Sequence, residues 1–594
     1  MGQLAGIYWF DRRPIDVSTR TEALSAFQNG CAVEGPGLLV AWEDCTGVTD
    51  GALSSANVCV LDGSIHNFKE AAASVALDRG ATPGVLALRL YEHNGPAALG
   101  KLIGDWSVAI WDARQRTVVL ASDYAGTRPL YYFRSDECFA WSSSLDRLAQ
   151  WMNCRHLDCA YVAEFLRTGF PRHLTPYRGI FPVPAGSAVS ASPRRTAVTG
   201  IWSLPVKHSI QYHREGAYEE HFRAVFREAV AVRLQTGAPV ASELSGGLDS
   251  SSIVCMADRL IASAAVPTPR IVTFSYLASH SPDLGYIGIA EQACSAILPV
   301  HLDAASFPVL TPQSPGCALP SWDESRQVEV HRRMQAMGLS VLLTGRLGDL
   351  ITGNTLDDSD QAADYFWRGQ IGAGVKEAFA WSRSQSIPVY PILWRALRTA
   401  AARPFARGLE KAIPSRRNRL RSLSELLSSR FFQCPQPLSG VLYSHPFTHR
   451  PLVEFMLAIP SAVMCRPGEP RRLMRRALRG IVPGAILRRG SKGNYEGLFL
   501  QSLRDCSTWL LNSGRELVLA GTKQTGRQEV VSGLRELSQG LPCRDMRIQQ
   551  AIRLELWLRQ RIECGAISVD EAEVTEFGDR GIPGSGIVRN RQPQ

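Results

Sequence analysis

The sequence has no apolar run near the roughly 18 residues that a membrane-spanning helix needs. Its first residues also lack the charged segment, apolar core and cleavage site that mark a secretory signal peptide. We therefore expect a cytoplasmic protein without a membrane partner. Hydrophobic residues make up 45% of the 594 positions, which is enough for large cores and predicts more than one domain.

Other absences narrow the chemistry. The 14 cysteines form no CxxC pair and have no histidine at metal-binding spacing, so neither a zinc site nor a secreted disulfide framework is predicted. The net charge of +10 comes without a recognition helix, a zinc finger or an aromatic-basic signature, so we expect no nucleic acid as partner. No GxxxxGK(S/T) loop occurs, which disfavours the γ-phosphate chemistry of common kinases and ATPases.

The most informative stretch that is present is SGGLDS at 245–250, between an apolar run and a helical pattern. Two consecutive glycines let the backbone approach a polyanion, and the following helix adds its positive dipole end. Asp249 can hold a Mg²⁺ that bridges phosphate oxygens, and Ser245 and Ser250 offer hydroxyl donors. The pattern predicts a pyrophosphate loop, and an ordinary Gly-rich turn capped by a serine is the alternative.

Residues 1 to about 205 read as short strands separated by turns, which predicts a mostly β, sandwich-like domain. The predicted strands cover 6–10, 37–42, 58–61, 106–112, 118–122 and 130–133.

The chain beyond about residue 206 changes character. A helix is expected over 217–234, followed by apolar strands that alternate with helical stretches, at 240–244, 271–276, 299–302 and 339–343. This alternation predicts a parallel sheet with helices on both faces, and ligands bind such sheets beyond the carboxyl ends of the strands. We expect this domain to extend to residue 577 and the tail over 578–594 to be disordered.

SGGLDS resembles the pyrophosphate loop of the ATP-pyrophosphatase family, whose members cleave ATP between the α and β phosphates and pass AMP to a carboxylate. TGRLGD at 344–349 resembles the second loop, SGxGxDE, of the asparagine-synthetase-like branch. The resemblance implies ATP and Mg²⁺ as cofactors, with Asp249 and Asp349 sharing the metal; a helix-capping role is the alternative for Asp349. The implied nucleotide contacts are Leu244, Ser245, Gly246, Gly247, Asp249, Ser250, Tyr276, Thr344 and Gly345.

Two positions in the second loop depart from the family pattern. Arg346 stands where asparagine synthetases carry a glutamate and β-lactam synthetases a tyrosine, and Leu350 replaces the usual acid. A guanidinium, with a pKa above about 12, cannot act as a general base at neutral pH. Arg346 is therefore a candidate catalytic residue that would act by binding a carboxylate or a phosphate. The alternative is that its side chain merely faces solvent.

Two stretches of the first domain resemble class II glutamine amidotransferases: DGSIHN at 62–67, and 104–132, which contains GDWSVAIWD and DYAGTRPLYY. The resemblance implies an Ntn-type α+β sandwich. That family uses a cysteine exposed as the first residue after methionine removal, whereas Gly2 occupies this position here. We therefore expect an inactive amidotransferase-like scaffold over residues 1–205.

The basic run 467–493, expected to be helical between Arg471 and Arg489, and the Trp- and Arg-rich stretch 357–430 look most like lasso-peptide macrolactam synthetases. That branch adenylates an Asp or Glu side chain of a precursor peptide, which its N-terminal amine then attacks. Lys492 is the implied catalytic residue, stabilising charge at the adenylate. The implied partners are the precursor peptide and, for its delivery, a leader-peptide-binding protein and a protease. An ammonia-using asparagine synthetase and a non-catalytic nucleotide- or peptide-binding scaffold remain alternatives.

Overall fold

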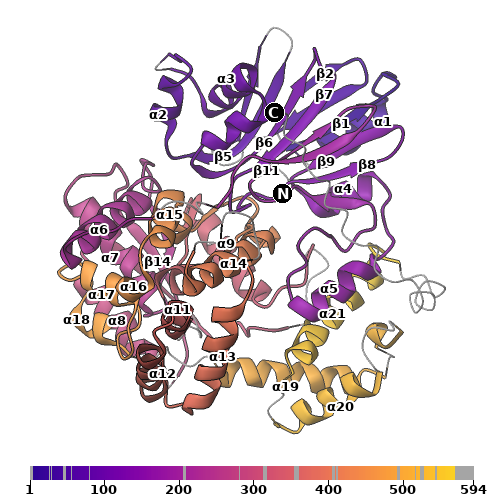
Figure 1. Cartoon of the computed structure of the whole chain (residues 1–594). Helices are drawn as coiled ribbons and strands as arrows, with labels where there is room; N and C mark the ends of the chain where they lie inside the picture. The colour runs from indigo at the N-terminus through magenta and orange to yellow at the C-terminus, as the bar shows by residue number, and fades with distance from the viewer. Residues whose placement is uncertain are drawn as a thin grey trace. The chain divides into compact units, whose positions relative to one another are not determined.

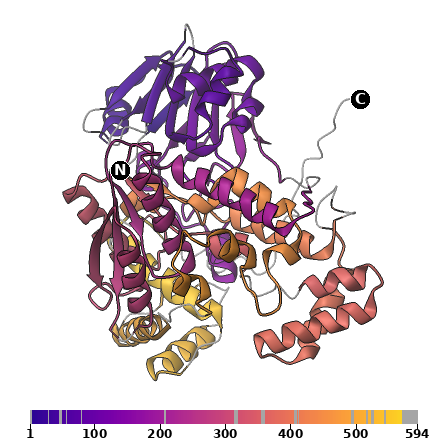
Figure 2. The ribbon, with the colours of Figure 1, turned by 90° about the vertical axis from the view of Figure 1, so that its left-hand side faces the viewer.

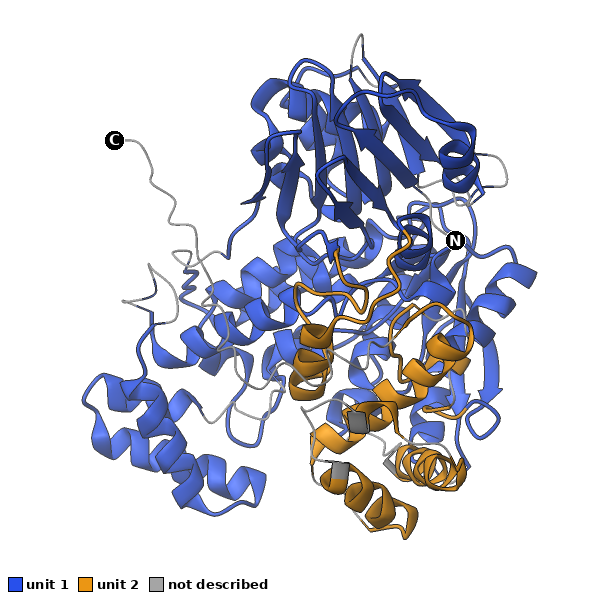
Figure 3. Cartoon of the chain, turned by 90° about the vertical axis from the view of Figure 1, so that its right-hand side faces the viewer, with its two compact units in different colours: residues 1–152, 180–307, 326–495 blue, residues 153–179, 308–325, 496–594 orange. Residues whose placement is uncertain are grey.

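The computed structural model describes the chain except residues 1–3, 26, 28–29, 44–48, 55–56, 79, 205–208, 280, 312–317, 354–359, 405–408, 410–411, 491–495, 515–516, 522–526, 542–544 and 569–594. Gly2, Lys492 and the expected tail at 578–594 therefore lie outside the described residues. The chain forms two compact units (Figure 3). Unit 1 comprises residues 1–152, 180–307 and 326–495, and unit 2 comprises 153–179, 308–325 and 496–594. Among the described helices, none is long and apolar enough to cross a membrane.

The N-terminal part of unit 1 contains two six-stranded antiparallel sheets. The first has the order β10-β8-β9-β1-β3-β2, and the second β12-β11-β7-β6-β5-β4. The strands of the first are β1 (Leu4–Trp9), β2 (Cys31–Gly35), β3 (Leu38–Trp42), β8 (Tyr131–Arg134), β9 (Cys138–Ser142) and β10 (Ile180–Pro182). Those of the second are β4 (Thr49–Leu53), β5 (Val58–Ile65), β6 (Gly104–Asp112), β7 (Thr117–Ser122), β11 (Ser187–Ala191) and β12 (Thr196–Gly200).

The two sheets pack face to face, and helices cover the second sheet's other face. Along β5, Val58 and Val60 enter the core between the sheets, whereas Cys59 and Leu61 enter the core beneath the helices. This alternation is the two-residue period of a strand whose faces are both buried. The helical layer contains α2 (Phe68–Ala73) and α3 (Pro83–Asn94) (Figure 1). Shorter helices are α1 (Val17–Leu24), α4 (Leu145–Trp151) and η1 (Pro96–Lys101).

The second part of unit 1 is built on a five-stranded parallel sheet of order β15-β14-β13-β16-β17. Its strands are β13 (Val240–Glu243), β14 (Ile271–Leu277), β15 (Ile297–Asp303), β16 (Val341–Leu343) and β17 (Leu442–Ser444). Four of them confirm the predicted strands, and β17 was not predicted. One face packs on α6 (Glu215–Ala231), α7 (Leu248–Ala262) and α8 (Asp283–Ala293). The other face packs on Val330 and Met334 of α9 (Glu324–Ala336).

The helices after β16 surround this sheet or project from it. The set is α10 (Gly348–Thr352), α11 (Gln361–Trp367), α12 (Ile371–Gln385), α13 (Val389–Ala401), α14 (Pro414–Ser428), η3 (Gln436–Leu438), η4 (Pro446–Thr448), α15 (Arg450–Ala458), α16 (Ser461–Met464), α17 (Arg472–Ala477) and α18 (Gly484–Arg488). Helices α11 to α13 pack on one another around a small core that also contains Cys465, and they form the group drawn in red in Figure 2.

The basic run does not form the single helix predicted between Arg471 and Arg489. Two short helices, α17 and α18, replace it. Arg471 has a left-handed backbone (φ 56°) just before α17, and Gly480 (φ 75°) follows its end. Positive φ values are incompatible with a continuous right-handed helix, so the chain turns at both places.

Unit 2 is helical, with α5 (Cys159–Thr168), α19 (Glu496–Asn512), η5 (Val518–Gly521), α20 (Arg527–Ser538) and α21 (Met546–Glu563). Helix α21 is buried on nearly every side. Arg553, within α21, lies 4.4 Å from the ring centre of Phe165 and 4.8 Å from that of Trp322. Burial lowers the pKa of Arg553 to about 10, so α21 is a central core helix of its unit.

Candidate active site

The two loops singled out in the sequence leave the same edge of the parallel sheet. Residues 245–250 follow β13, and residues 344–349 follow β16. These strands are parallel neighbours, with Ala241 opposite Leu342 and Ser242 opposite Leu343. Because the carboxyl ends of adjacent parallel strands meet at one edge, the loops come together there, as doubly wound sheets require of their ligand sites.

The glycines of the second loop permit its close approach to the first. A Cβ added at Gly345 would lie 3.0 Å from the Cβ of Asp249, and one added at Gly348 would overlap the Asp249 carboxylate. Gly246 has a φ of 69°, and a Cβ there would lie 2.9 Å from the Asp283 carbonyl oxygen. A larger residue at any of these positions would push apart the two loops or the helix that packs on them.

Asp249 and Asp349 converge on the guanidinium of Arg471. The Nη1 atom donates to Asp249 Oδ2 at 3.0 Å and to Asp349 Oδ1 at 2.9 Å, while Nη2 bonds Asp249 Oδ1. The Arg471 side chain is 4% exposed, against 14% for Asp249 and 26% for Asp349. Opposite charges so close together are strongly coupled where water is scarce. Sequence reasoning missed Arg471 as an individual residue, because it lies in a run of arginines.

A second arginine anchors the glycine turn. Arg489 Nη1 donates to the Gly246 carbonyl oxygen at 2.9 Å, and Nη2 pairs with Asp283 of α8. The guanidinium carbon also lies 4.2 Å from the centre of the Tyr286 ring. These contacts hold the SGG backbone in place and bring a buried positive charge beside it. Neither Arg489 nor Asp283 was identified from the sequence.

The remaining predicted nucleotide contacts take up different positions. The hydroxyl oxygens of Ser245 and Ser250 lie 3.0 Å apart, and the Ser245 N–H donates to Ser250 Oγ at 3.1 Å. Leu244 is buried in the core, and its N–H donates to the Phe274 carbonyl oxygen. Tyr276, near the end of β14, donates its hydroxyl to the Arg326 carbonyl oxygen at 2.9 Å. Their roles toward a nucleotide stay predictions.

Arg346 is half-buried among aromatic rings. Its Nη1 donates to the Phe431 carbonyl oxygen at 2.9 Å, and its guanidinium carbon lies 5.1 Å from the Phe431 ring centre and 5.4 Å from that of Tyr443. Stacking of this kind suits a planar guanidinium and orients it. These contacts therefore hold the Arg346 side chain beside the second loop. Its contact with a substrate anion stays a prediction.

His445 ties the second loop to β17. Its Nε2 lies 3.1 Å from the Phe432 carbonyl oxygen, an acceptor, so Nε2 must carry the proton. Its Nδ1 therefore accepts from the Thr344 hydroxyl at 2.7 Å. Burial, followed by the charge of Arg346, lowers the pKa of His445 to about 3, so the ring is neutral at physiological pH. The Thr344 N–H also donates to the Ser444 carbonyl oxygen at 3.0 Å.

The donor set at the loops suits one hard divalent cation. Among the described residues, no cluster of three or more His, Cys, Asp or Glu side chains is arranged to hold a metal. Two carboxylates brought to one point are, however, what Mg²⁺ commonly takes from a protein when substrate phosphates and water complete its shell. Asp249 and Asp349 therefore fit the predicted magnesium site.

Residues of the two amidotransferase-like motifs form buried ion pairs where the sandwich meets the parallel sheet. Arg128 donates to both carboxylate oxygens of Asp62, at 2.8 and 2.9 Å, and to the Val441 carbonyl oxygen at 3.0 Å. Asp105 pairs with Arg233 at 3.2 Å and accepts from the Ser444 hydroxyl. Val441 and Ser444 bracket β17, so these buried acids hold the strand next to the second loop.

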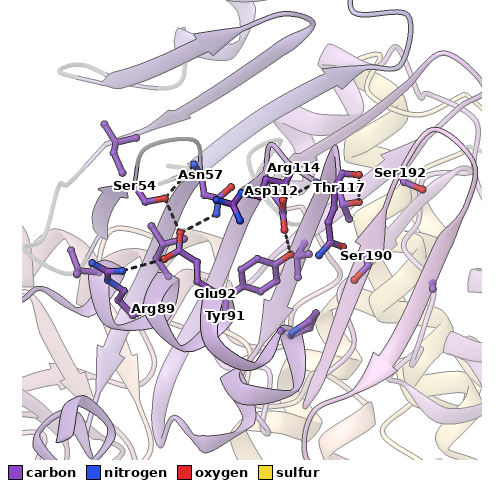
Figure 4. Close-up of a pocket in the computed structure, with 18 of the residues that line it drawn as sticks. Ser54, Asn57, Arg89, Tyr91, Glu92, Asp112, Arg114, Thr117, Ser190 and Ser192 are labelled. Atoms are coloured by element: carbon purple, nitrogen blue, oxygen red, sulfur yellow. Dashed lines mark hydrogen bonds and ion pairs between the residues drawn. The ribbon is translucent and has the colours of Figure 1, made fainter. Parts of the chain in front are cut away.

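A pocket of about 960 Å³ lies elsewhere on the sandwich, along α3 and the second sheet (Figure 4). Its acids already have partners. Glu92 accepts from Ser54 and Asn57, and Asp112 accepts from the Tyr91 hydroxyl at 2.9 Å. The residues lining it include none from the loops at 245–250 and 344–349. It is separate from the candidate active site.

Comparison with known proteins places this architecture. A family model described as asparagine synthase matches residues 221–559, more than half of the chain. The chain belongs to the asparagine synthase family. A model of the glutamine amidotransferase domain matches residues 52–202. Members of the asparagine synthase family are ATP-dependent, AMP-forming carbon–nitrogen ligases.

Individual relatives are distant. Amidase chry2 of Gibberella zeae is 26% identical over 210 residues, which cover 34% of this chain and 31% of that protein. A putative glutamine-hydrolysing asparagine synthetase 2 of Methanocaldococcus jannaschii is 26% identical over 213 residues, covering 34% and 41%. A glutamine-hydrolysing asparagine synthetase 3 of Bacillus subtilis is 22% identical over 450 residues, covering 70% and 72%. The chain thus spans less than half the length of the first two relatives.

One solved structure that matches is a glutamine phosphoribosylpyrophosphate amidotransferase from B. subtilis complexed with ADP and GMP. The match covers 58% of this chain and 85% of the amidotransferase chain. The identity is 12% and the TM-score 0.23, too low for any conclusion about this chain.

Proposed function

We propose that this protein is a lasso-peptide macrolactam synthetase, an ATP-dependent ligase that closes a ring within a precursor peptide. A side-chain carboxylate oxygen of an Asp or Glu attacks the α-phosphorus of ATP, and pyrophosphate leaves. The peptide's N-terminal amine then attacks the activated carbonyl carbon and loses a proton, and AMP departs as the amide forms. The observation that carries the AMP-forming part is the convergence of Asp249 and Asp349 at the edge of the parallel sheet.

The loop residues have distinct tasks in this reaction. The glycine turn at 245–247 binds the departing pyrophosphate through its N–H groups, and Arg489 fixes the conformation of that turn. Asp249 and Asp349 would hold a Mg²⁺, which would supply positive charge to the phosphate oxygens. Lys492 stabilises the charge that develops as the amine attacks.

The position of Arg346 argues for a substrate whose amine needs no nearby acid or tyrosine as base. The peptide's own terminal amine has an ordinary pKa of about 8, so a usable fraction is already unprotonated at neutral pH. A fixed guanidinium beside the second loop suits a contact with a peptide carboxylate or the adenylate phosphate. This supports an amine nucleophile within the substrate.

The helical group α11–α13 supports a peptide substrate. It exposes apolar and aromatic side chains that a monomeric enzyme acting on small molecules would not need: Trp367, Ile371, Phe379, Tyr390, Trp394 and Leu397. Trp394 and Tyr390 are each at least 70% exposed. We assign this surface to the precursor peptide.

The test is mass spectrometry of a candidate precursor peptide incubated with the protein, ATP and Mg²⁺. We expect a product lighter by one water, whose ring links the N-terminal amine to one Asp or Glu side chain. A matched peptide with that residue changed to Asn or Gln should stay linear. Unchanged peptides with every precursor encoded beside the gene, together with amidation of aspartate by ammonia, would reject the proposal.

That second outcome would favour an ammonia-using asparagine synthetase; two of the relatives are named as asparagine synthetases, of the glutamine-hydrolysing kind. Glutamine should not serve as nitrogen source in either case, because Gly2 offers no nucleophile in place of the amidotransferase cysteine. We expect no glutamate release from glutamine.

A further inference from the structure

A positive charge already occupies the point where the two acidic loops meet. Both carboxylate oxygens of Asp249 and Oδ1 of Asp349 contact the guanidinium of Arg471. A Mg²⁺ bound by both acids would need oxygens of the same two carboxylates, at about 2.0–2.1 Å. A planar guanidinium bonded to those oxygens and a divalent cation cannot occupy that space together.

The guanidinium is held there by more than the acids. Its Nε donates to the Thr352 hydroxyl at 2.8 Å, and Nη2 lies 3.0 Å from the Met474 sulfur. The Arg471 backbone is in the left-handed region, with a φ of 56°, and its N–H donates to the Gly353 carbonyl oxygen at 3.3 Å. The strained backbone and the 4% exposed side chain indicate that the fold positions Arg471 specifically for this contact, unlike a weak surface ion pair.

We propose that Arg471 sets the metal affinity of the site by competing with the divalent cation for Asp249 and Asp349. The bare ion, which offers only its charge, displaces the guanidinium poorly. A cation that arrives with a polyphosphate brings further oxygen ligands and displaces it readily. The chain therefore takes up metal together with nucleotide rather than before it. This inference rests on the proposed function for the place of the metal, but not on the identity of the carboxylate substrate.

The variant that tests this is Arg471→Met, which keeps an unbranched, flexible but shorter side chain and removes its charge. Methionine meets the same backbone cost as arginine at this φ, because neither is glycine. Arg472→Met is the matched control. It removes an equally buried charge one residue away, where Arg472 pairs with Glu215 and Glu469, each at 2.7 Å.

The measurement is the binding of Mn²⁺, a paramagnetic stand-in for Mg²⁺, to the full chain without nucleotide, followed by the electron paramagnetic resonance signal of the free ion. Arg471→Met should bind Mn²⁺ about tenfold more tightly or better than the unmodified chain, because charged hydrogen bonds no longer have to be broken. Arg472→Met should match the unmodified chain. Adding Asp249→Asn to Arg471→Met should remove the gain.

Equal Mn²⁺ affinity in the unmodified chain and Arg471→Met would overturn the inference, as would an equal gain in Arg472→Met. If Arg471→Met does not fold, Arg471→Lys replaces it. A compact ammonium cannot bridge both acids as the guanidinium fork does, so its Mn²⁺ affinity should rise by a smaller factor, and no rise would again overturn the inference. The titration needs no turnover, so its failure is distinguishable from failure of the ligase reaction.

Discussion

Acidic residues serve opposite ends in two regions of unit 1. At the boundary between the sandwich and the parallel sheet, Asp62 and Asp105 are at most 3% exposed, and each pairs with its own arginine. At the two loops, Asp249 and Asp349 stay partly open to solvent and share one arginine. A buried acid that is paired with one arginine fixes the structure. Two partly exposed acids that share one arginine keep carboxylate oxygens that a ligand can bind.

The comparison also shows how the sandwich is tied to the synthetase site. Arg128 and Asp105 bond across the boundary to Val441 and Ser444 around β17, and Asp62 holds the Arg128 guanidinium. That strand in turn bonds to Thr344, the first residue of the second loop. The sandwich thus supports the synthetase site mechanically, whatever its own chemistry.

The largest effect should follow from Asp249→Asn or Asp349→Asn. Each change removes one charge where the phosphates and their metal would bind, with little change in volume. We expect AMP formation to fall by about 10³ or more, while the melting temperature shifts by only a few degrees. Steady-state rates and calorimetry on the same preparations check this. Large destabilisation with a near-normal rate would place these acids with the structural pairs.

Lys492→Ala tests the one candidate catalytic residue outside the described residues. Loss of a single fixed donor to a developing charge costs about 10²–10³ in rate. Lys492→Arg should be impaired less, because it keeps the charge but not the compact shape. Single-turnover amide formation at saturating ATP is the measurement. An unchanged rate in the alanine variant would leave Arg346 as the next candidate.

Asp105→Asn should have the reverse profile of Asp249→Asn. It leaves the buried guanidinium of Arg233 without its carboxylate partner. Removing one partner of a buried ion pair lowers the free energy of unfolding by about 3–5 kcal/mol. Denaturant unfolding should therefore show a markedly lower midpoint. The variant enzyme that remains folded should keep most of its ligase rate. A stable variant with a collapsed rate would mean that the sandwich acts on the chemistry directly.

A smaller effect concerns pH. The pKa of His445 falls from its ordinary 6.5 to about 3 because the ring is buried. Between these values the unfolded chain binds a proton that the folded chain refuses, so stability is lost as pH falls below 6.5. At pH 5.0 the loss amounts to about 2 kcal/mol. His445→Gln keeps a donor for Phe432 and an acceptor for Thr344, and its melting temperature should fall less between pH 7.0 and 5.0. Identical pH profiles would contradict the neutral, buried ring.

The sequence predicted the parts of this molecule that depend on local patterns. Apolar runs bounded by turns located β13 to β16, and the glycine spacing located both loops. It did not predict β17, a three-residue strand whose place is decided by pairing with β16 and by Arg128 from far along the chain. Nor did it identify Arg471 and Arg489, because only tertiary structure distinguishes them among neighbouring arginines. The prediction of one basic helix between Arg471 and Arg489 was wrong for a related reason. The composition of this run favours a helix, but the backbone turns at Arg471 and Gly480.

The central claim is that the two acidic loops form one site that cleaves ATP between the α and β phosphates. The most direct measurement uses ATP labelled at the α-phosphate, incubated with Mg²⁺ and the precursor peptide, with the labelled products separated by chromatography. We expect labelled AMP from the unmodified chain and from Arg472→Met, and almost none from Asp249→Asn. Labelled ADP as the main product, or AMP formed equally well by Asp249→Asn, would contradict it.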